Sequence, residues 1–152
     1  MPAHKGGSTK QVRLMLKNMK IERNAAGREV VFTGAPWEPV IGYSRAMRVG
    51  DRIEVTGTIG LDENGACPKD PSEQTRNALA IVIRAIEVLG GRREDIVRTR
   101  IFMTDISLWE EVGRIHAEVL SGVLPTTTMV EVSRLADPSA LLEVEASAVV
   151  GS

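Results

Sequence analysis

Hydrophobic residues recur at spacings of three and four in two stretches of the chain, which predicts two amphipathic helices. The apolar face of the first is Leu79, Val82, Ile83, Ile86 and Leu89, and that of the second is Val112, Ile115, Val119 and Leu120. Asp70 and Pro71 are typical of a helix start, because aspartate caps free backbone N–H groups and proline suits the first helical position. Gly90-Gly91 then predicts the end of the first helix, and Gly122 the end of the second.

Short runs of β-branched and aliphatic residues predict strands around these helices. The predicted strands cover residues 43–49, 53–56, 95–105, 126–132 and 141–150, with a further short strand at 29–33. Gly50-Asp51 separates the first two main runs and is typical of a tight hairpin turn. The order β-β-α-β-α-β-β makes each helix a crossover, which predicts an α+β fold: a mixed β-sheet with two helices packed on one face. The other face is then bare, and a second copy of the chain is its simplest cover.

Composition restricts the possible partners of this 152-residue chain, whose length suggests one domain. Nineteen basic and twenty acidic residues give a net charge of −1, which argues against nucleic acid and anionic membranes as partners. No run approaches the eighteen apolar residues that a membrane-spanning helix needs. A single cysteine, Cys67, and the lack of an apolar secretory segment predict a cytoplasmic protein.

The charge is concentrated near the N-terminus, where residues 1–23 carry a net +5 and leave −6 for the rest. Val12, Met15 and Met19 fall at helical spacing there, so a short basic amphipathic helix is one interpretation and a mobile extension is the other. We predict a partly mobile N-terminal extension over residues 1–35 and a folded domain over residues 36–152.

The chain lacks the motifs of metal and cofactor chemistry. His4 and His116 are far apart, and with one cysteine they cannot form a standard zinc site, so we expect no metal and no cofactor. His116 follows Ile115 on the second predicted helix, which favours a partly buried structural histidine over a catalytic base. Nothing near Cys67 is suited to lower the pKa of its thiol, which argues against a nucleophile.

Carboxylates on the last predicted strand are the remaining candidates. Glu143 and Glu145 are two residues apart, so they share one face of the strand while the aliphatic residues between them face the other. On a covered face they would need partners, and several arginines in or beside strands could pair with them: Arg45, Arg98, Arg100 and Arg134. Such a cluster is either a structural network or a binding site for a small anion, and the sequence leaves both open.

Six stretches, in order over residues 36–150, resemble the YjgF/RidA family, also called reactive intermediate deaminases or the endoribonuclease L-PSP family. The stretches are GYSR at 42–45, VTGTI at 55–59, QTRNAL at 74–79, DIVRTRIF at 95–102, LPTTTMVEV at 124–132 and LEVEA at 142–146. The resemblance implies a chorismate-mutase-like homotrimer, in which three subunits join their bare faces and form a pocket at each interface. It also implies hydrolysis of reactive imines or enamines to a ketoacid and ammonia.

The resemblance implies roles for individual residues. Tyr43 matches a substrate-binding tyrosine, and Glu143 matches the catalytic glutamate that helps to place the attacking water. In active deaminases an arginine in a P-x-R motif grips the substrate carboxylate, but that position is Thr127 here. A charge-assisted arginine pair is roughly twice as strong as a neutral hydrogen bond, so its loss should weaken binding of a 2-imino acid tenfold or more. We predict that Thr127 and Thr128 bind substrate oxygens and that Arg45 supplies the missing charge.

These observations leave three hypotheses for function. In the first, a trimeric small-molecule-binding protein hydrolyses imines, enamines or related small metabolites at interface pockets, without being a standard 2-imino acid deaminase. In the second, a non-catalytic ligand-binding or regulatory protein keeps the same fold. An endoribonuclease is the weakest, because it needs phosphate-binding basic groups and an acid–base pair. The expected partners are two more copies of the chain and a small, anionic metabolite.

Overall fold

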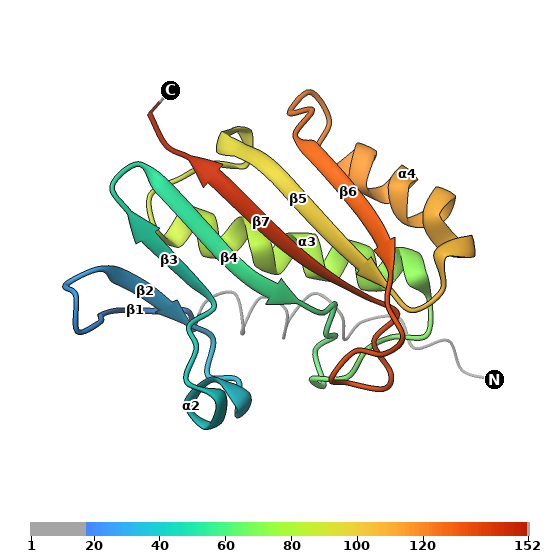
Figure 1. The fold of residues 1–152 in the computed structure, drawn as a ribbon, viewed down its shortest axis with the longest axis horizontal. Helices are drawn as coiled ribbons and strands as arrows, with labels where there is room; N and C mark the ends of the chain where they lie inside the picture. The colour runs from blue at the N-terminus through green and yellow to red at the C-terminus, as the bar shows by residue number, and fades with distance from the viewer. Residues whose placement is uncertain (1–17, 152) are drawn as a thin grey trace.

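The computed structural model describes residues 18–151, which form one seven-stranded sheet with its two long helices on one face (Figure 1). The strand order across the sheet is β1-β2-β3-β4-β7-β5-β6. The β5–β6 pair is parallel and the other neighbouring strands are antiparallel. The strands are β1 (Lys20–Arg23), β2 (Glu29–Phe32), β3 (Ala46–Val49), β4 (Arg52–Thr58), β5 (Ile96–Met103), β6 (Thr126–Glu131) and β7 (Leu142–Val149).

The two long helices lie behind the sheet in the view of Figure 1, which confirms the predicted α+β fold and the order of elements from β3 to β7. The long helices are α3 (Pro71–Val88) and α4 (Trp109–Val119), the short one is α2 (Trp37–Ile41), and the 3-10 turns are η1 (Arg93–Asp95) and η2 (Ile106–Leu108). None of the helices within residues 18–151 is long and apolar enough to cross a membrane.

The core lies between the sheet and the two long helices. Residues of β7 alternate between buried and half-buried, so Leu142 and Val144 face the helices while Glu143 and Glu145 face away. The aliphatic side chains that meet them are fully buried: Ile53, Leu79, Val82, Ile86, Ile101 and Val112. Removal of this apolar surface from water holds the helices on one side and leaves the opposite face of the sheet without a covering element in the described chain.

Local signals at the predicted boundaries are confirmed. The Asp70 carboxylate accepts a hydrogen bond from the Ser72 backbone N–H at 3.0 Å, and Pro71 begins α3. In the β3–β4 hairpin Val49 pairs with Arg52, so Gly50-Asp51 is the two-residue turn, and Gly50 has a φ of 63°. A positive φ of this kind is favourable for glycine because it has no Cβ.

The sheet extends further toward the N-terminus than residue 36, where we predicted the domain to begin. Strand β2, expected at 29–33, pairs with β3 and buries Val31 completely, and β1 completes the hairpin. The final residues of the basic segment, Lys20–Arg23, are therefore strand, whereas the rest of the predicted amphipathic segment lies mostly outside the described residues. The sequence did not predict α2, because five residues that include Pro39 show no helical periodicity.

We predict that Gly113→Ala stabilises the protein. Gly113 lies within α4, and a Cβ there would meet only the Met129 methyl carbon at 3.6 Å, an ordinary contact. Because alanine has the higher helix propensity, urea denaturation should show a free energy of unfolding higher by about 0.5–1 kcal/mol. The matched control is Gly60→Ala, whose Cβ would overlap the Gln74 backbone and should destabilise the protein. Destabilisation by Gly113→Ala would contradict the packing of α4 on β6.

Candidate functional site

A bulge in β4 is the centre of the candidate site. The pairing of β4 with β7 changes register between Val55 and Thr58, which leaves one extra residue on β4. Arg45, the residue before β3, reaches this bulge: its Nη1 donates to the Gly57 carbonyl oxygen at 3.0 Å and to Thr58 Oγ1 at 3.1 Å. The guanidinium therefore holds the irregular backbone of β4 in place.

The second guanidinium nitrogen of Arg45 faces two further groups. It lies 3.4 Å from the Tyr43 hydroxyl, which accepts its hydrogen bond, and 3.9 Å from the buried carboxylate of Glu38. The guanidinium carbon also lies 5.5 Å from the centre of the Tyr43 ring, within cation–π range. With its side chain only 10% exposed, Arg45 is committed to its own chain. This arrangement favours a role in positioning Tyr43 and the bulge over the free substrate-binding charge that we predicted.

Glu143 approaches the bulge from β7. Its carboxylate occupies the space where a side chain of residue 57 would lie, so only glycine at that position permits the approach. Burial raises the pKa of Glu143, the positive charge of Arg45 opposes that rise, and Glu145 adds to it. A half-buried carboxyl with a raised pKa, in a site that also holds the half-buried Tyr43, is suited to accept and return a proton from bound water.

Thr127 and Thr128 lie elsewhere in the chain, on β6. In the sheet Glu143 pairs with Phe102 of β5, whereas Thr127 pairs with Thr99, three residues along β5 from Phe102. Thr127 is therefore roughly 10 Å along the strands and roughly 10 Å across them from Glu143. Its side chain points to the α4 side, where its Oγ1 lies 2.8 Å from Thr99 Oγ1, so Thr128 points to the other face. One chain thus brings Tyr43, Arg45 and Glu143 together and leaves both threonines apart.

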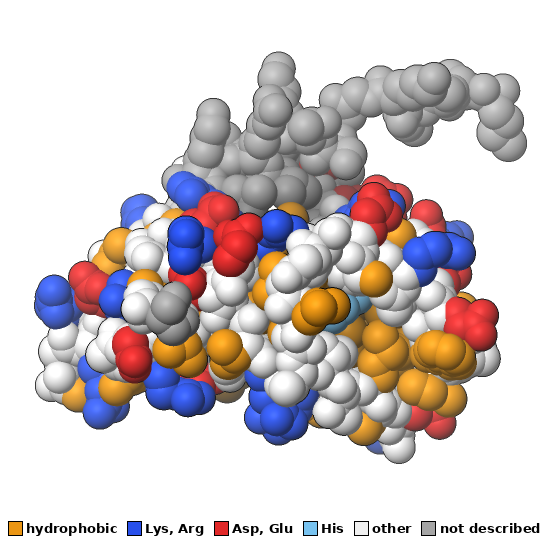
Figure 2. All heavy atoms as spheres, turned by 90° about the horizontal axis from the view of Figure 1, so that it is seen from above, with side chains coloured by type: hydrophobic (Ala, Val, Ile, Leu, Met, Phe, Trp, Pro, Cys, Tyr) orange, Lys and Arg blue, Asp and Glu red, His pale blue; other side chains and the backbone are white. Residues whose placement is uncertain are grey.

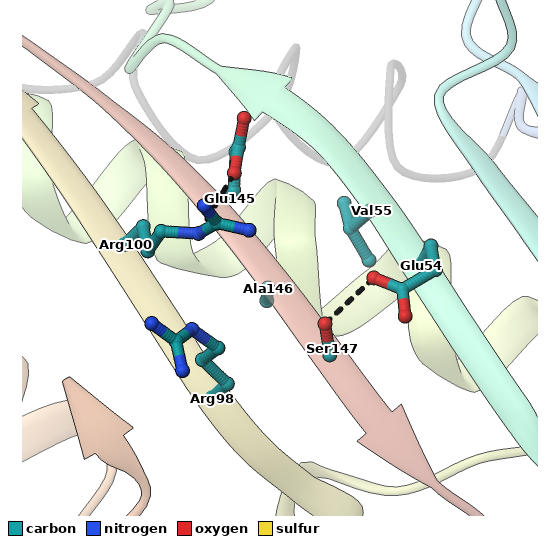
Figure 3. A pocket seen from close by; sticks show the side chains of 7 residues that line it. All are labelled: Glu54, Val55, Arg98, Arg100, Glu145, Ala146 and Ser147. Carbon is teal, nitrogen blue, oxygen red and sulfur yellow. Dashed lines mark hydrogen bonds and ion pairs between the residues drawn. The ribbon is translucent and has the colours of Figure 1, made fainter. Parts of the chain in front are cut away.

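A polar network covers the bare face beside Glu143 (Figure 3). Arg100 Nε lies 3.3 Å from Glu145 Oε2, and Ser147 Oγ donates to Glu54 Oε2 at 2.6 Å, around a small pocket of about 30 Å³. Arg98 of β5 also lines this pocket, with its guanidinium turned away from β7 in Figure 3, and it forms no ion pair within residues 18–151. The predicted pairing of strand carboxylates with strand arginines is therefore found for Glu145 and Arg100.

A larger groove of about 1020 Å³ runs next to this network, between α2 and the strands β2 to β4. Tyr43, Ser44 and Thr56 line it on one side, and the prolines of the α2 segment, Pro36 and Pro39, line it on the other. The groove is open, so a small molecule there would need a further surface to enclose it.

The sequence did not identify Gly57, Glu38, Thr99 or His116 as parts of these networks. A glycine inside a strand pattern was the available signal for the bulge.

Burial raises the pKa of the Cys67 thiol, which disfavours the nucleophilic thiolate. Among residues 18–151 no group of three or more His, Cys, Asp or Glu side chains is placed to hold a metal ion.

We predict that Glu143→Gln stabilises the protein at neutral pH. Because the folded pKa of Glu143 is raised, the folded state binds its proton more tightly than the unfolded state, and stability falls as pH rises above the ordinary value of 4.5. Glutamine removes this loss, so urea denaturation should show a gain at about pH 7 that shrinks at about pH 4. Glu145→Gln, which loses the Arg100 ion pair, is the control without such a gain. An equal effect of Glu143→Gln at both pH values would contradict the burial of Glu143.

Solved structures of similar fold cover most of the chain. A Mycobacterium tuberculosis protein, Rv2704, described as a member of the YjgF/YER057c/UK114 family, is 42% identical with a TM-score of 0.75. The alignment covers 81% of this chain and 99% of that one. Escherichia coli TdcF, solved with bound serine, is 26% identical with a TM-score of 0.68, over 72% of this chain and 88% of TdcF.

Sequence comparison gives the same result. A RutC family protein of Pyrococcus abyssi is 32% identical over 80% of this chain and 96% of the relative. A Streptomyces coelicolor protein is 35% identical over 80% of this chain and 92% of its own length. The profile of the family described as Endoribonuclease L-PSP matches residues 33–150. The chain therefore belongs to the YjgF/RidA family, the endoribonuclease L-PSP family that its six sequence stretches resemble.

Proposed function

We propose that three copies of this chain assemble into a ring whose pockets, between neighbouring copies, bind a small anionic metabolite. The observation that carries the proposal is that the site is incomplete within one chain. Tyr43 lines an open groove and Glu143 lies against Gly57, next to the groove residue Thr56, while Thr127 and Thr128 lie on the edge strand β6. A neighbouring copy that docks its β6 against the groove would bring its two threonines to Tyr43 and Glu143 of the first copy.

Two exposed apolar patches support this assembly. One lies on α2, where Val40 is 77% exposed beside Trp37 and Ile41. The other set of exposed apolar residues is spread over the opposite end of the sheet order, with Leu124 before β6 88% exposed and Trp109 of α4 and Val130 of β6 also exposed. Figure 2 shows hydrophobic side chains gathered at the end of the molecule where α4 and β6 lie in Figure 1. Contact between unlike ends of two copies is heterologous, and such contacts form a ring when the rotation between neighbouring copies closes.

A hydrolytic role is supported by Glu143. In the assembled pocket its half-buried carboxyl would hold a water molecule beside the Gly57 backbone, ready to attack the C=N bond of an imine, or of the imine that an enamine forms when it takes a proton on carbon. The serine bound in TdcF is a small molecule with a carboxylate, which supports a ligand of the same chemical kind here. The uncharged Thr127 argues against the standard 2-imino acid deaminase reaction at full efficiency.

The second candidate is a non-catalytic binding or regulatory protein with the same pockets. It is supported by Arg45, whose Nη1 and Nη2 donate to Gly57, Thr58 and Tyr43, so that these groups are not available to replace the missing charge. Ribonuclease activity has less support. Cleavage of RNA needs an acid–base pair, and His116, the histidine within residues 18–151, lies on the α4 side of the sheet, opposite to Glu143.

The first prediction from this proposal concerns mass. Light scattering after size exclusion should give 49.5 kDa, three times the 16.5 kDa of the chain. Val40→Glu on α2 places a charge in the proposed interface and should shift the protein toward monomers. Arg52→Glu, in an exposed pair with Glu54, is a matched surface control and should leave the mass unchanged. A monomeric wild type would exclude the interface pocket.

The second prediction concerns charge at position 127. Thr127→Arg should create or raise hydrolysis of freshly generated 2-iminopropanoate by tenfold or more, because it restores a bidentate partner for the substrate carboxylate. Thr127→Lys is the comparison that supplies charge without the planar fork, and it should gain less. Release of pyruvate and ammonia is the measurement. Full activity of the wild type would show that Thr127 does not limit the reaction.

A further inference from the structure

A chain of hydrogen bonds connects Thr127 to the interior of the protein. Thr99 Oγ1 lies 2.8 Å from Thr127 Oγ1 and 2.9 Å from His116 Nε2. Thr99 is fully buried between the sheet and α4, so its hydroxyl has these two polar side chains as its neighbours. Thr127 itself is exposed, and its hydroxyl donates to the Pro125 carbonyl oxygen at 3.3 Å.

The direction of donation along these hydrogen bonds depends on whether Nε2 of the His116 imidazole carries a proton. A hydroxyl has one proton to donate, so a Thr99 that donates to His116 must accept from Thr127, which then offers only lone pairs to a ligand. When His116 Nε2 carries a proton, Thr99 accepts from the ring and is free to donate to Thr127. Thr127 then no longer donates to Thr99, and its proton can pass from the Pro125 carbonyl oxygen to an outside ligand. The neutral ring supports both directions, whereas the imidazolium supports only the outward one and adds a positive charge.

We propose that Thr127, Thr99 and His116 form a proton-coupled anion site, in which binding of a small carboxylate at Thr127 is linked to uptake of a proton by His116. This inference rests on the proposed interface pocket and names how its anion is recognised. The charge that family deaminases carry permanently on an arginine at this position would be conditional here. His116 is a positioning residue in this scheme, because it acts on the ligand through the two threonines.

The surroundings of His116 leave its charge to be set by the ligand. Burial lowers the pKa of His116, so the ring is mostly neutral near pH 7 without a ligand. The charged groups of the elements packed around His116 have other partners. Arg76 of α3 pairs with Glu118 of α4, and Glu111 of α4 accepts a hydrogen bond from Ser72. Arg93 of η1 donates to the Val119 carbonyl, and Arg100 of β5 pairs with Glu145 on the opposite face of the sheet. Arg98 of β5 shares that opposite face, and Arg114 of α4 is exposed.

The linkage fixes the sign of the pH dependence. A bound carboxylate favours the imidazolium, so it raises the pKa of His116, and by reciprocity a protonated His116 raises the affinity for the carboxylate. Affinity should therefore be highest at low pH and fall as pH rises. Protonation of Glu143 would act in the same direction, because a neutral carboxyl repels an anion less than a carboxylate does. The experiment must separate the two groups.

Pyruvate is a suitable probe, and calorimetric titrations from about pH 5.5 to about pH 8 measure its affinity. For the wild type we expect affinity to fall by at least about threefold over this range. His116→Gln and Thr99→Val should lose this slope, Thr99→Ser should keep it because the hydroxyl remains, and Glu143→Gln should keep it whatever its absolute affinity. We call the coupling of Thr127 to His116 through Thr99 the relay. A pH dependence of pyruvate affinity that survives His116→Gln or Thr99→Val, or disappears in Glu143→Gln, would overturn it.

Nuclear magnetic resonance gives a direct readout at the ring. The chain has two histidines, so the spectrum of His116→Gln identifies the His116 signal. Saturating pyruvate should raise the pKa of His116 in the wild type and leave it unchanged in Thr99→Val. An unchanged His116 titration in the wild type, under conditions where pyruvate binds, would overturn the proposal.

Thr127→Arg separates failure of the relay from failure of the pocket. It carries a permanent charge, so it should bind pyruvate more tightly than the wild type and with no dependence on His116. If Thr127→Arg binds while the wild type shows no pH slope, the pocket stands and the relay is wrong. If Thr127→Arg also fails to bind pyruvate at every pH, both the relay and the proposed pocket are wrong.

Discussion

The buried guanidinium of Arg45 is the contact on which the candidate site depends. It joins the residue before β3 to the bulge of β4 through Gly57 and Thr58, and it holds the hydroxyl of Tyr43. Without these hydrogen bonds the Gly57 carbonyl would be an unpaired polar group in a half-buried position, which is costly. The same positive charge moderates the pKa of Glu143. One side chain thus fixes both the geometry and the electrostatics of the face where Glu143 lies.

This dependence makes Arg45 poorly suited to replace the arginine that the family resemblance implies at position 127. A guanidinium has five donors in a fixed fork, and those of Arg45 on Nη1 and Nη2 point to groups of its own chain. To grip a ligand it would have to leave Gly57 and Thr58, and the bulge would lose its support. The sequence pattern cannot show which groups the Arg45 side chain contacts. An arginine at this position gives the same pattern whether its side chain binds a ligand or a backbone carbonyl.

The fold was largely predictable from the sequence, and the site only in part. Alternating residues in β7 and helical spacing in α3 and α4 fix which face is buried, because burial of apolar surface is the dominant favourable term. Tyr43 and Glu143 were identified by resemblance, and the structure places both beside the bulge. The positions of Thr127 and His116 were not predictable. Their neighbours come from β5 and α4, residues far apart in the sequence, and contacts of this kind depend on tertiary packing.

If position 127 corresponds to the arginine that the family resemblance implies, a threonine there changes more than one charge. A threonine hydroxyl is short and neutral, so its use depends on what stands behind it, and here that is a buried hydroxyl and an imidazole. The two hydrogen bonds order the Thr127 side chain in advance, and ordering before binding lowers the entropic cost of binding. Under the proposed relay, a site of this kind favours weak carboxylic acids, whose binding is accompanied by a proton on His116, over ligands that need a permanent positive charge in the protein. Loss of the arginine is thus compatible with a pocket that still recognises anions, but by a different physical rule.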